Sequence, residues 1–446
     1  MEQSARGAWT SRTGFILAAA GSAIGLGNIW RFPYVTGMQG GAAFVAVYLA
    51  CVLAIGIPVL IAELTLGRHT ALNPVGAIRA ITTSRFWPLV GYLGVITGAA
   101  ILSYYAVIAG WTVGYIFRTI AHSSSSFGSF VADPAIEIGN FALFLLLTAG
   151  VVVGGVERGI ERWSKILMPL LFLILLGLIA FALTLEGASK GVEFYLKPDF
   201  SKITGSTVLA ALGQAFFSLS LGMGAMITYG SYISKRENLA ISAASVALAD
   251  TLIAVLAGLV VFPALFSVGQ EPTQGPSLVF NVLPRIFEMM PGGTIVGVFF
   301  FILLAIAALT STVSLLEVPV AFLVDQKKWS RKKAVAIVTS IVFVIGLPSA
   351  LSQGTVPALS SIDWFGGRDF LGVMDFVFGN LSLTFGGLLL AILVGWIWGT
   401  RKAAEELQLG AGPRYSALIP GWSFMLRFVC PLIIAAVLLN LTGIFE

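Results

Sequence analysis

Long apolar stretches, separated by short polar connections, run through the whole chain. Each of about eleven such stretches is long enough to cross roughly 30 Å of hydrocarbon as a helix. The stretches are continuous, unlike the alternating ten-residue strands of an outer-membrane barrel. The pattern predicts an all-α integral membrane protein with spans near residues 12–36, 42–66, 87–120, 139–154, 164–185, 208–233, 239–268, 292–324, 333–350, 370–398 and 422–444.

The composition agrees with a membrane protein. Of the 446 residues, 57% are hydrophobic and 11% are charged, whereas soluble domains carry roughly 25% charged residues. Cys51 and Cys430 lie inside apolar stretches, so we expect neither a disulfide nor a metal cluster. The sequence contains no zinc-protease spacing, nucleotide-binding loop or catalytic serine motif. We therefore expect no enzymatic activity, no organic cofactor and no nucleic-acid partner.

Lysine and arginine residues gather in alternate connections, and the remaining connections are neutral or acidic. Short loops rich in these residues face the cytoplasm. The N-terminus is therefore predicted to be cytoplasmic in the cell (inner) membrane, and an odd number of spans places the C-terminus outside. The basic connections hold Arg6, Arg12, Arg68, Arg79, Arg85, Arg158, Arg162, Lys165, Lys235, Arg236, Lys327, Lys328, Arg331, Lys332, Lys333, Arg401, Lys402 and Arg414.

Two spans contain clusters of glycine at mid-depth, within residues 21–28 and 218–224. Glycine costs about 1 kcal/mol per residue in a helix, so each cluster favours a break. A single glycine more often lets neighbouring helices approach closely, but here both clusters occupy the first span of a five-span block. Paired breaks of this kind indicate an inverted repeat with a transport site at the midplane. We predict one transporter domain (1–446), with repeats at 12–185 and 208–398 and an extra helix at 422–444.

A broken helix offers free carbonyl groups to a cation and free amides to a carboxylate. Few ionisable residues are available inside the spans: Glu63, Asp250, Glu317 and Asp375, with Arg31 nearer the outer end. Such residues are expensive in a membrane and have functional or paired roles by default. For Glu63 and Glu317, structural hydrogen bonding and a proton path both remain open.

The eighth span carries Thr310, Ser311 and Thr312 in an apolar stretch. Their hydroxyl groups could bind sodium, because hard cations prefer oxygen ligands. The alternative is that each hydroxyl bonds to the helix carbonyl four residues earlier. The residues by themselves leave both possibilities open.

Three motifs carry a resemblance to a known family. Residues 20–33 (AGSAIGLGNIWRFP), 214–224 (QAFFSLSLGMG) and 308–311 (ALTS) are similar to the first, sixth and eighth helices of the neurotransmitter:sodium symporter family, in its bacterial branch for hydrophobic and aromatic amino acids. The motifs occur in the family's order over nearly the whole chain. The resemblance implies an inverted five-plus-five fold with broken helices 1 and 6, and alternating access.

The same resemblance implies two Na⁺ sites and one substrate pocket. One ion would be bound by the substrate carboxylate with Ala23, Asn28, Ser218 and Asp250. The other would be bound by Gly21, Ile24, Ala307, Thr310 and Ser311. The pocket would be lined by Ala23, Gly25, Leu26, Gly27, Ile101, Tyr105, Phe217, Ser218, Ser220, Met223, Ser311 and Leu315.

Gates and a hinge also follow from the resemblance. The outer gate would pair Arg31 with Asp375 beneath a roof of Tyr105 and Phe217. The inner gate would pair Arg6 with Asp325, together with Trp9 and Tyr232. Gly159 and Pro169 resemble a pair in the fifth helix whose local unwinding opens a water path, and a proline there removes a helix hydrogen bond.

Departures from the family pattern shape the expected activity. Chloride-dependent relatives carry a serine where this chain has Ala254, so Asp250 would supply the negative charge and transport would not need chloride. Gly25 stands where monoamine transporters carry an aspartate. We expect sodium-coupled import of neutral hydrophobic L-amino acids, aromatic ones included. The expected partners are this substrate and the lipid bilayer, with no obligatory protein partner. A proton-coupled permease of the same fold and a non-transporting membrane sensor are the alternatives.

Overall fold

The computed structural model describes residues 7–123, 125–270, 279–289, 292–411 and 413–441. These residues form helices, and their one isolated β-bridge joins Ile362 and Arg368. Among these described residues, nine helical stretches are long and apolar enough to cross a membrane. They are α3–α4 (Ala42–Thr70), α6 (Pro88–Ile120), α8 (Pro134–Val153), Val156–Ala182 with α9 (Arg162–Ala182), α13 (Leu239–Ser267), α15 (Gly293–Lys327), α16 (Arg331–Leu351), Phe370–Gln408, and Ser416–Leu441.

Some of these stretches consist of several helices, and shorter helices lie in the connections. Phe370–Gln408 contains α18 (Phe370–Met374), α19 (Leu383–Ile392) and α20 (Thr400–Gln408), and Ser416–Leu441 contains α21 (Ile419–Phe424) and α22 (Cys430–Leu441). π-Helical turns join most of these pieces. The connections hold α5 (Pro74–Ile81), α7 (Phe127–Val131), α10 (Ala188–Leu196), α14 (Val282–Met289) and α17 (Pro357–Ser360).

The first span is interrupted within the glycine cluster. Helix α1 (Arg12–Ala23) ends where Ile24 adopts an extended backbone, and a second helical segment, Gly27–Met38 with α2 (Phe32–Met38), continues at a bend of 52°. Gly25 lies in the break. A Cβ atom there would lie 2.5 Å from Ser311 Oγ and 2.6 Å from Tyr105 Oη, so only glycine fits.

The sixth span is interrupted as well. Helix α11 (Gly205–Ser218) and helix α12 (Ala225–Gly230) are separated by residues 219–224, in which Ser220, Gly222 and Gly224 have positive φ angles. This backbone region favours glycine because a Cβ atom is strained there. Gly222 also packs directly on α19, since a Cβ atom there would lie 2.2 Å from the Leu383 carbonyl oxygen.

The observed helices match most of the predicted spans. Counting the bent first span gives ten spans among the described residues, and the one remaining predicted span is the sixth, 208–233, which is divided into α11 and α12. Several boundaries were wrong, two of them by eight residues or more. The fifth span begins at Val156 instead of 164, because a π-helical turn precedes α9, and the tenth continues to Gln408 instead of 398, because the polar helix α20 follows a kink at Gly399 (φ +89°).

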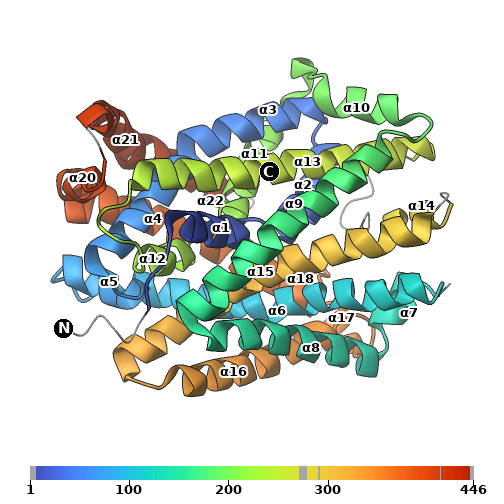
Figure 1. Cartoon of the computed structure of the whole chain (residues 1–446), viewed down its shortest axis with the longest axis horizontal. Helices are drawn as coiled ribbons and strands as arrows, with labels where there is room; N and C mark the ends of the chain where they lie inside the picture. The colour runs from blue at the N-terminus through green and yellow to red at the C-terminus, as the bar shows by residue number, and fades with distance from the viewer. Residues whose placement is uncertain (1–6, 124, 271–278, 290–291, 412, 442–446) are drawn as a thin grey trace.

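The helices run roughly parallel to the long axis of the molecule (Figure 1). Helices α5, α12 and α20 lie at the end where the N-terminus is drawn, and α7, α10 and α14 lie at the opposite end. The long helix α15 packs against α6, α8, α9 and α16 and also contacts α1 and α12. The two breaks therefore face each other beside α6 and α15.

Gly222→Ala should destabilise the protein. A Cβ atom there would meet the Leu383 carbonyl oxygen at 2.2 Å, and an alanine at φ +83° adds of order 1–3 kcal/mol of backbone strain. Gly213→Ala is a matched control, because Gly213 lies inside α11 and a Cβ atom there meets nothing within 4 Å. Thermal unfolding of the purified protein should show a midpoint below that of wild type for Gly222→Ala but not for Gly213→Ala. Equal midpoints for the two variants would contradict this account of the break.

Candidate functional site

A small buried cavity lies where the two helix breaks meet α6 and α15. Its volume is about 30 Å³. Ten of the twelve predicted pocket residues line it; Leu26 and Ser218 do not. The lining residues are Ser22, Ala23, Gly25, Gly27, Ile101, Tyr105, Phe217, Ser220, Met223, Ser311, Leu315 and Leu383.

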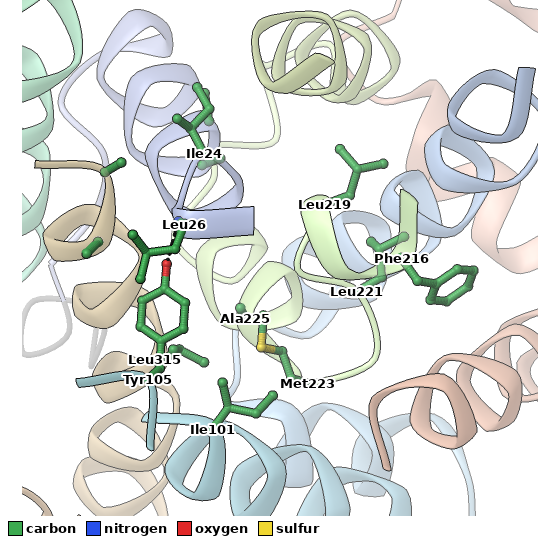
Figure 2. Close-up of a cluster of buried hydrophobic side chains, with 14 of the residues drawn as sticks. Ile24, Leu26, Ile101, Tyr105, Phe216, Leu219, Leu221, Met223, Ala225 and Leu315 are labelled. Carbon is green, nitrogen blue, oxygen red and sulfur yellow. Dashed lines mark hydrogen bonds between the residues drawn. The ribbon is translucent and has the colours of Figure 1, made fainter. Parts of the chain in front are cut away.

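Tyr105 of α6 connects the wall of the cavity to the first break. The Leu26 backbone amide donates a hydrogen bond of 2.8 Å to the Tyr105 hydroxyl oxygen. Figure 2 shows this bond, with the Ile101 and Met223 side chains near each other on another side of the same space. Leu26 thus belongs to the site through its backbone, and one tyrosine hydroxyl satisfies an amide that the break leaves without a helical partner.

One polar cluster lies beside the cavity, between the π-helical turn Gly27–Arg31 before α2, α11 and α13. The Asn28 Nδ2 group donates to Asp250 Oδ1 (2.7 Å) and to Ser218 Oγ (3.1 Å), and Ser218 Oγ donates to Asp250 Oδ2 (2.7 Å). Tyr48 Oη lies 3.5 Å from Asp250 Oδ2. The structure therefore brings together three of the four residues predicted for the first sodium site, and Ala23 lines the adjoining cavity. Tyr48 is a neighbour that the sequence did not indicate.

A second group of oxygens joins the end of α1 to α15. Thr310 Oγ1 lies 3.4 Å from the Ile24 carbonyl oxygen and 3.0 Å from the Ala307 carbonyl oxygen. Ser311 Oγ lies 3.3 Å from each of the same two carbonyl oxygens. Gly21 packs against Thr310, because a Cβ atom there would lie 3.2 Å from Thr310 Cβ. All five residues predicted for the second sodium site therefore meet, and their oxygens are of the type that a hard cation prefers.

Comparison with known proteins assigns the chain to a family. Residues 6–126 and 132–444 match the sequence profile of the Sodium:neurotransmitter symporter family. The chain belongs to this family. Its members are membrane transporters, which agrees with the spans described above, so the chain is a sodium-dependent symporter. Membership favours sodium over the proton-coupled permease that the sequence left open.

Individual relatives cover nearly the whole chain. The sodium-dependent transporter YhdH of Bacillus subtilis is 39% identical over 447 residues, which covers 98% of each chain. Sodium- and chloride-dependent GABA transporter 2 of Homo sapiens is 25% identical over 95% of this chain and 79% of its own length. Among solved structures, MhsT in complex with L-phenylalanine matches with a TM-score of 0.89 at 45% identity, covering 98% of this chain and 100% of MhsT.

One side of the symporter's cavity is covered by Arg31 and Phe217, two residues predicted for the outer gate. The Arg31 guanidinium lies over the Phe217 ring, 4.6 Å from its centroid. The sequence predicted a direct pair between Arg31 and Asp375. In the structure these two residues do not pair directly. Arg31 Nη2 donates to Asn380 Oδ1 (3.2 Å), and Asn380 Nδ2 donates to Asp375 Oδ2 (3.2 Å). Tyr104 Oη also donates to Asp375 Oδ1 (3.0 Å), so an amide bridges the two charged residues.

At the end of the molecule that carries α12, aromatic side chains predicted for the inner gate pack together. Trp9 Nε1 donates to the Tyr229 carbonyl oxygen (3.0 Å), and the Trp9 ring packs edge-on against the rings of Tyr229 and Tyr232. Asp325 Oδ2 accepts hydrogen bonds from the backbone and side chain of Asn73, at 3.0 and 2.8 Å. Asn73 caps α5. A polar residue directly before a Pro-initiated helix could have indicated this capping role, whereas the contact with Asp325, far along the chain, could not be predicted.

Glu317 has a clear structural role. It is fully buried and accepts hydrogen bonds from Tyr232 Oη (2.8 Å) and from Arg331 at the start of α16. Arg331 also donates to the Val152 carbonyl oxygen (2.7 Å), which ties α8, α15 and α16 together. These bonds favour structural hydrogen bonding over a proton path for Glu317. Arg6, the predicted partner of Asp325, lies outside the described residues.

The predicted hinge residues of helix 5 both lie in helical backbone. Gly159 is part of the π-helical turn before α9, and α9 continues past Pro169. Glu161 follows Gly159 and binds the N-terminal segment, accepting from the Thr10 amide (2.8 Å) and from Thr10 Oγ1 (2.5 Å). Gly14 packs against Glu161, since a Cβ atom there would overlap its carboxyl group. The start of α1 and the hinge segment are therefore joined directly.

Glu63 supports the break in helix 6 from α4. It is fully buried, and its Oε1 accepts a hydrogen bond of 2.7 Å from the Gly222 amide. The carboxyl group also lies near the amides of Met226 and Ile227 in the first turn of α12, but its Oε2 makes no hydrogen bond within the described part of the chain. An acid near the N-terminus of a helix satisfies amides that have no helical partner. The contact favours a structural role for Glu63.

Variants of Glu63 should separate hydrogen bonding from proton transfer. Glu63→Ala leaves the buried Gly222 amide without an acceptor, which should cost about 1–3 kcal/mol of stability. Glu63→Gln retains a carbonyl oxygen and should lie closer to wild type in thermal unfolding and in sodium-dependent uptake. If Glu63→Gln folds normally but does not transport, the carboxyl group has a role beyond accepting this hydrogen bond.

Proposed function

We propose that this symporter imports neutral hydrophobic L-amino acids, aromatic ones included, together with sodium by alternating access. The observation that carries the proposal is the chemistry of the cavity between the two breaks. Its walls are mainly apolar, and its polar groups are backbone, hydroxyl and amide groups near the helix ends. No lysine, arginine, aspartate or glutamate is among the lining residues.

The two ends of an amino acid would be recognised by the broken helices. Amides freed by the breaks and a neighbouring sodium ion favour a carboxylate. Carbonyl oxygens and hydroxyl groups suit an ammonium group. The Ser22 carbonyl oxygen already accepts from Ser220 Oγ (3.0 Å) and Ser311 Oγ (3.2 Å), so polar groups converge at this point.

The side chain of the substrate would meet Ile101, Met223 and Leu315. Gly25 leaves no place for a carboxylate, because even a Cβ atom there would lie within 2.6 Å of the Ser311 and Tyr105 oxygens. A substrate with an amine side chain would therefore find no counter-charge. Methionine is unbranched and adapts to side chains of different size, so several hydrophobic amino acids should fit. The similarity to MhsT, solved with L-phenylalanine, supports this range.

The sodium sites proposed here use the two oxygen clusters. Asn28, Ser218, Asp250 and the Ala23 carbonyl group would hold one ion near the substrate carboxylate. The second ion would bind between α1 and α15. Two sodium ions, the substrate carboxylate and ionised Asp250 sum to zero charge, which reduces the cost of burying them. The substrate ammonium group adds one positive charge, which carbonyl oxygens and hydroxyl groups would solvate. Chloride is then not required, and uptake should be unchanged when gluconate replaces chloride.

The orientation and internal symmetry of the chain belong to the same proposal. The two interrupted spans begin the two predicted repeats, 12–185 and 208–398. The basic connections after α4, α12 and α15 lie at the end of the molecule that carries α5, α20 and the N-terminus (Figure 1). This arrangement supports a cytoplasmic N-terminus. Cysteine labelling in whole cells at exposed positions of α20 and α14 would test it, since only α14 should react with an impermeant reagent.

The proposed second sodium site can be tested with Thr310→Val combined with Ser311→Ala. The double variant keeps the carbonyl groups but removes both hydroxyl ligands, so the sodium concentration for half-maximal uptake should rise about tenfold or more, equivalent to at least about 1.4 kcal/mol. Thr312→Val is the control, because Thr312 bonds to Thr148 on α8 (2.8 Å), away from this cluster. An unchanged sodium dependence in the folded double variant would exclude the two hydroxyl groups from the site.

The substrate range can be tested by competition against sodium-dependent uptake of labelled L-phenylalanine in proteoliposomes. Leucine, isoleucine, valine, methionine, tyrosine and tryptophan should compete, each buried methylene adding about 0.8 kcal/mol until the cavity is full. Glycine, proline, GABA, lysine, glutamate and serotonin should compete far more weakly. Equal competition by glutamate or serotonin would contradict the assignment of the cavity.

A further inference from the structure

Arg427 is an arginine inside a membrane span, far from the transport site. It lies in the stretch Ser416–Leu441, whose apolar character qualifies it as a span. At a rise of about 1.5 Å per residue, its backbone is about 12 Å along the helix from Ile419. Charged residues at such depth are rare and have a functional or paired role by default. The sequence analysis assigned no role to this residue.

The structure holds the Arg427 guanidinium in place from one side. Its Nε donates a hydrogen bond of 3.0 Å to the Gly395 carbonyl oxygen, in the π-helical turn before α20. It also lies over the Trp396 ring, 5.1 Å from the centroid, and Trp396 Nε1 donates to the Arg427 carbonyl oxygen (3.0 Å). The two helical segments approach closely at Gly395, where a Cβ atom would lie 3.3 Å from the Leu426 carbonyl oxygen.

The charge of Arg427 is not neutralised within the described part of the chain, where no acidic side chain lies within 4 Å of it. Its terminal nitrogens form no hydrogen bond there either, although a guanidinium offers five N–H donors. The side chain is partly exposed on the outer surface of the bundle. Trp396, Phe424 and Phe428 are 49%, 56% and 44% exposed around it. The surroundings of Arg427 are therefore lipid-facing and aromatic, and its guanidinium has N–H donors without acceptors among the described residues.

We propose that Arg427, held in place over the Trp396 ring, binds the phosphate group of an anionic phospholipid in the leaflet next to α20. A lipid phosphate supplies both the negative charge and the paired acceptor oxygens that a planar guanidinium binds bidentately. A long arginine side chain can extend from within the hydrocarbon towards the headgroup region. Arg401 and Lys402 lie exposed at the start of α20. Arg401 pairs with Glu405 at 3.8 Å, and Lys402 adds positive charge at the same end of the bundle, which attracts anionic lipids.

The exposed aromatic residues would lie against the lipid chains. Phe424 and Phe428 pack on each other at 5.5 Å, and Phe428 packs edge-on against Trp396 at 5.4 Å. Aromatic rings of this kind are enriched at the boundary between headgroups and hydrocarbon. The site thus combines a fixed cation with a preformed apolar surface, and both match the two parts of a phospholipid.

Native mass spectrometry of the full-length protein, titrated with phosphatidylglycerol or phosphatidylcholine, tests the proposal. Arg427→Gln should weaken the tightest phosphatidylglycerol binding about fivefold or more, the effect expected for one basic residue at an anionic membrane surface, and should leave phosphatidylcholine binding unchanged. Arg401→Gln is the matched control, because Arg401 is also basic and near α20 but 95% exposed. It should have a smaller effect than Arg427→Gln. Identical phosphatidylglycerol titrations for wild type and Arg427→Gln would overturn the site.

Two further measurements keep the test decisive. Trp396→Phe retains the charge of Arg427 but removes the indole N–H that fixes the ring, so it should also weaken phosphatidylglycerol binding. If Arg427→Gln does not fold, Trp396→Phe and Arg427→Lys replace it in the test. Wild-type phosphatidylglycerol binding in both of these variants would overturn the proposal. Light scattering after size-exclusion chromatography reports the oligomeric state. If Arg427→Gln dissociates a dimer without changing lipid binding, the occupant is a second copy of the chain and the lipid site is wrong.

Discussion

Every backbone amide and carbonyl group inside hydrocarbon needs a hydrogen-bond partner from the protein, and this constraint governs the whole site. Breaking two helices at mid-depth leaves such groups without helical partners. Side chains from other spans supply part of the compensation: Tyr105 accepts from Leu26, Glu63 accepts from Gly222, and Gln214 donates to the Gly27 carbonyl oxygen at 2.9 Å. The groups that remain, mainly carbonyl oxygens at the end of α1, are the ones proposed to bind sodium and substrate.

The same compensation links the site to the rest of the protein. Glu63 belongs to α4, Tyr105 to α6 and the Gly222 packing partner Leu383 to α19, so three spans outside the broken pair fix its geometry. A movement of either break must therefore exchange hydrogen bonds with these spans. Towards the two faces, Asn380 and Glu317 connect the cavity to wider polar networks. Opening one face while the other stays closed requires only some of these bonds to change.

Much of this arrangement could be predicted from the sequence, because its causes are local. Long apolar stretches fix the spans, and the glycine clusters at 21–28 and 218–224 fix the breaks. The family resemblance then placed the residues of both oxygen clusters, which the structure brings together. The contacts of Asn380, Asn73 and Arg331 could not be predicted, because each joins segments far apart in the chain, and nothing local distinguishes them from ordinary polar residues at helix ends. Arg427 is a different case, because its position inside an apolar span is visible in the sequence. It was overlooked because the stretch is recognised as a span whether or not this residue is considered.

The central claim is that sodium and an amino acid share one site at the meeting point of the two breaks. Equilibrium binding of labelled L-phenylalanine to the purified protein, in sodium chloride and in potassium chloride, tests it most directly because no membrane gradient or gate is involved. The account predicts tight binding only with sodium. It also predicts that saturating phenylalanine raises the affinity for sodium by the same factor, since linkage between two ligands is reciprocal. Equal phenylalanine affinity in the two salts would contradict the shared site.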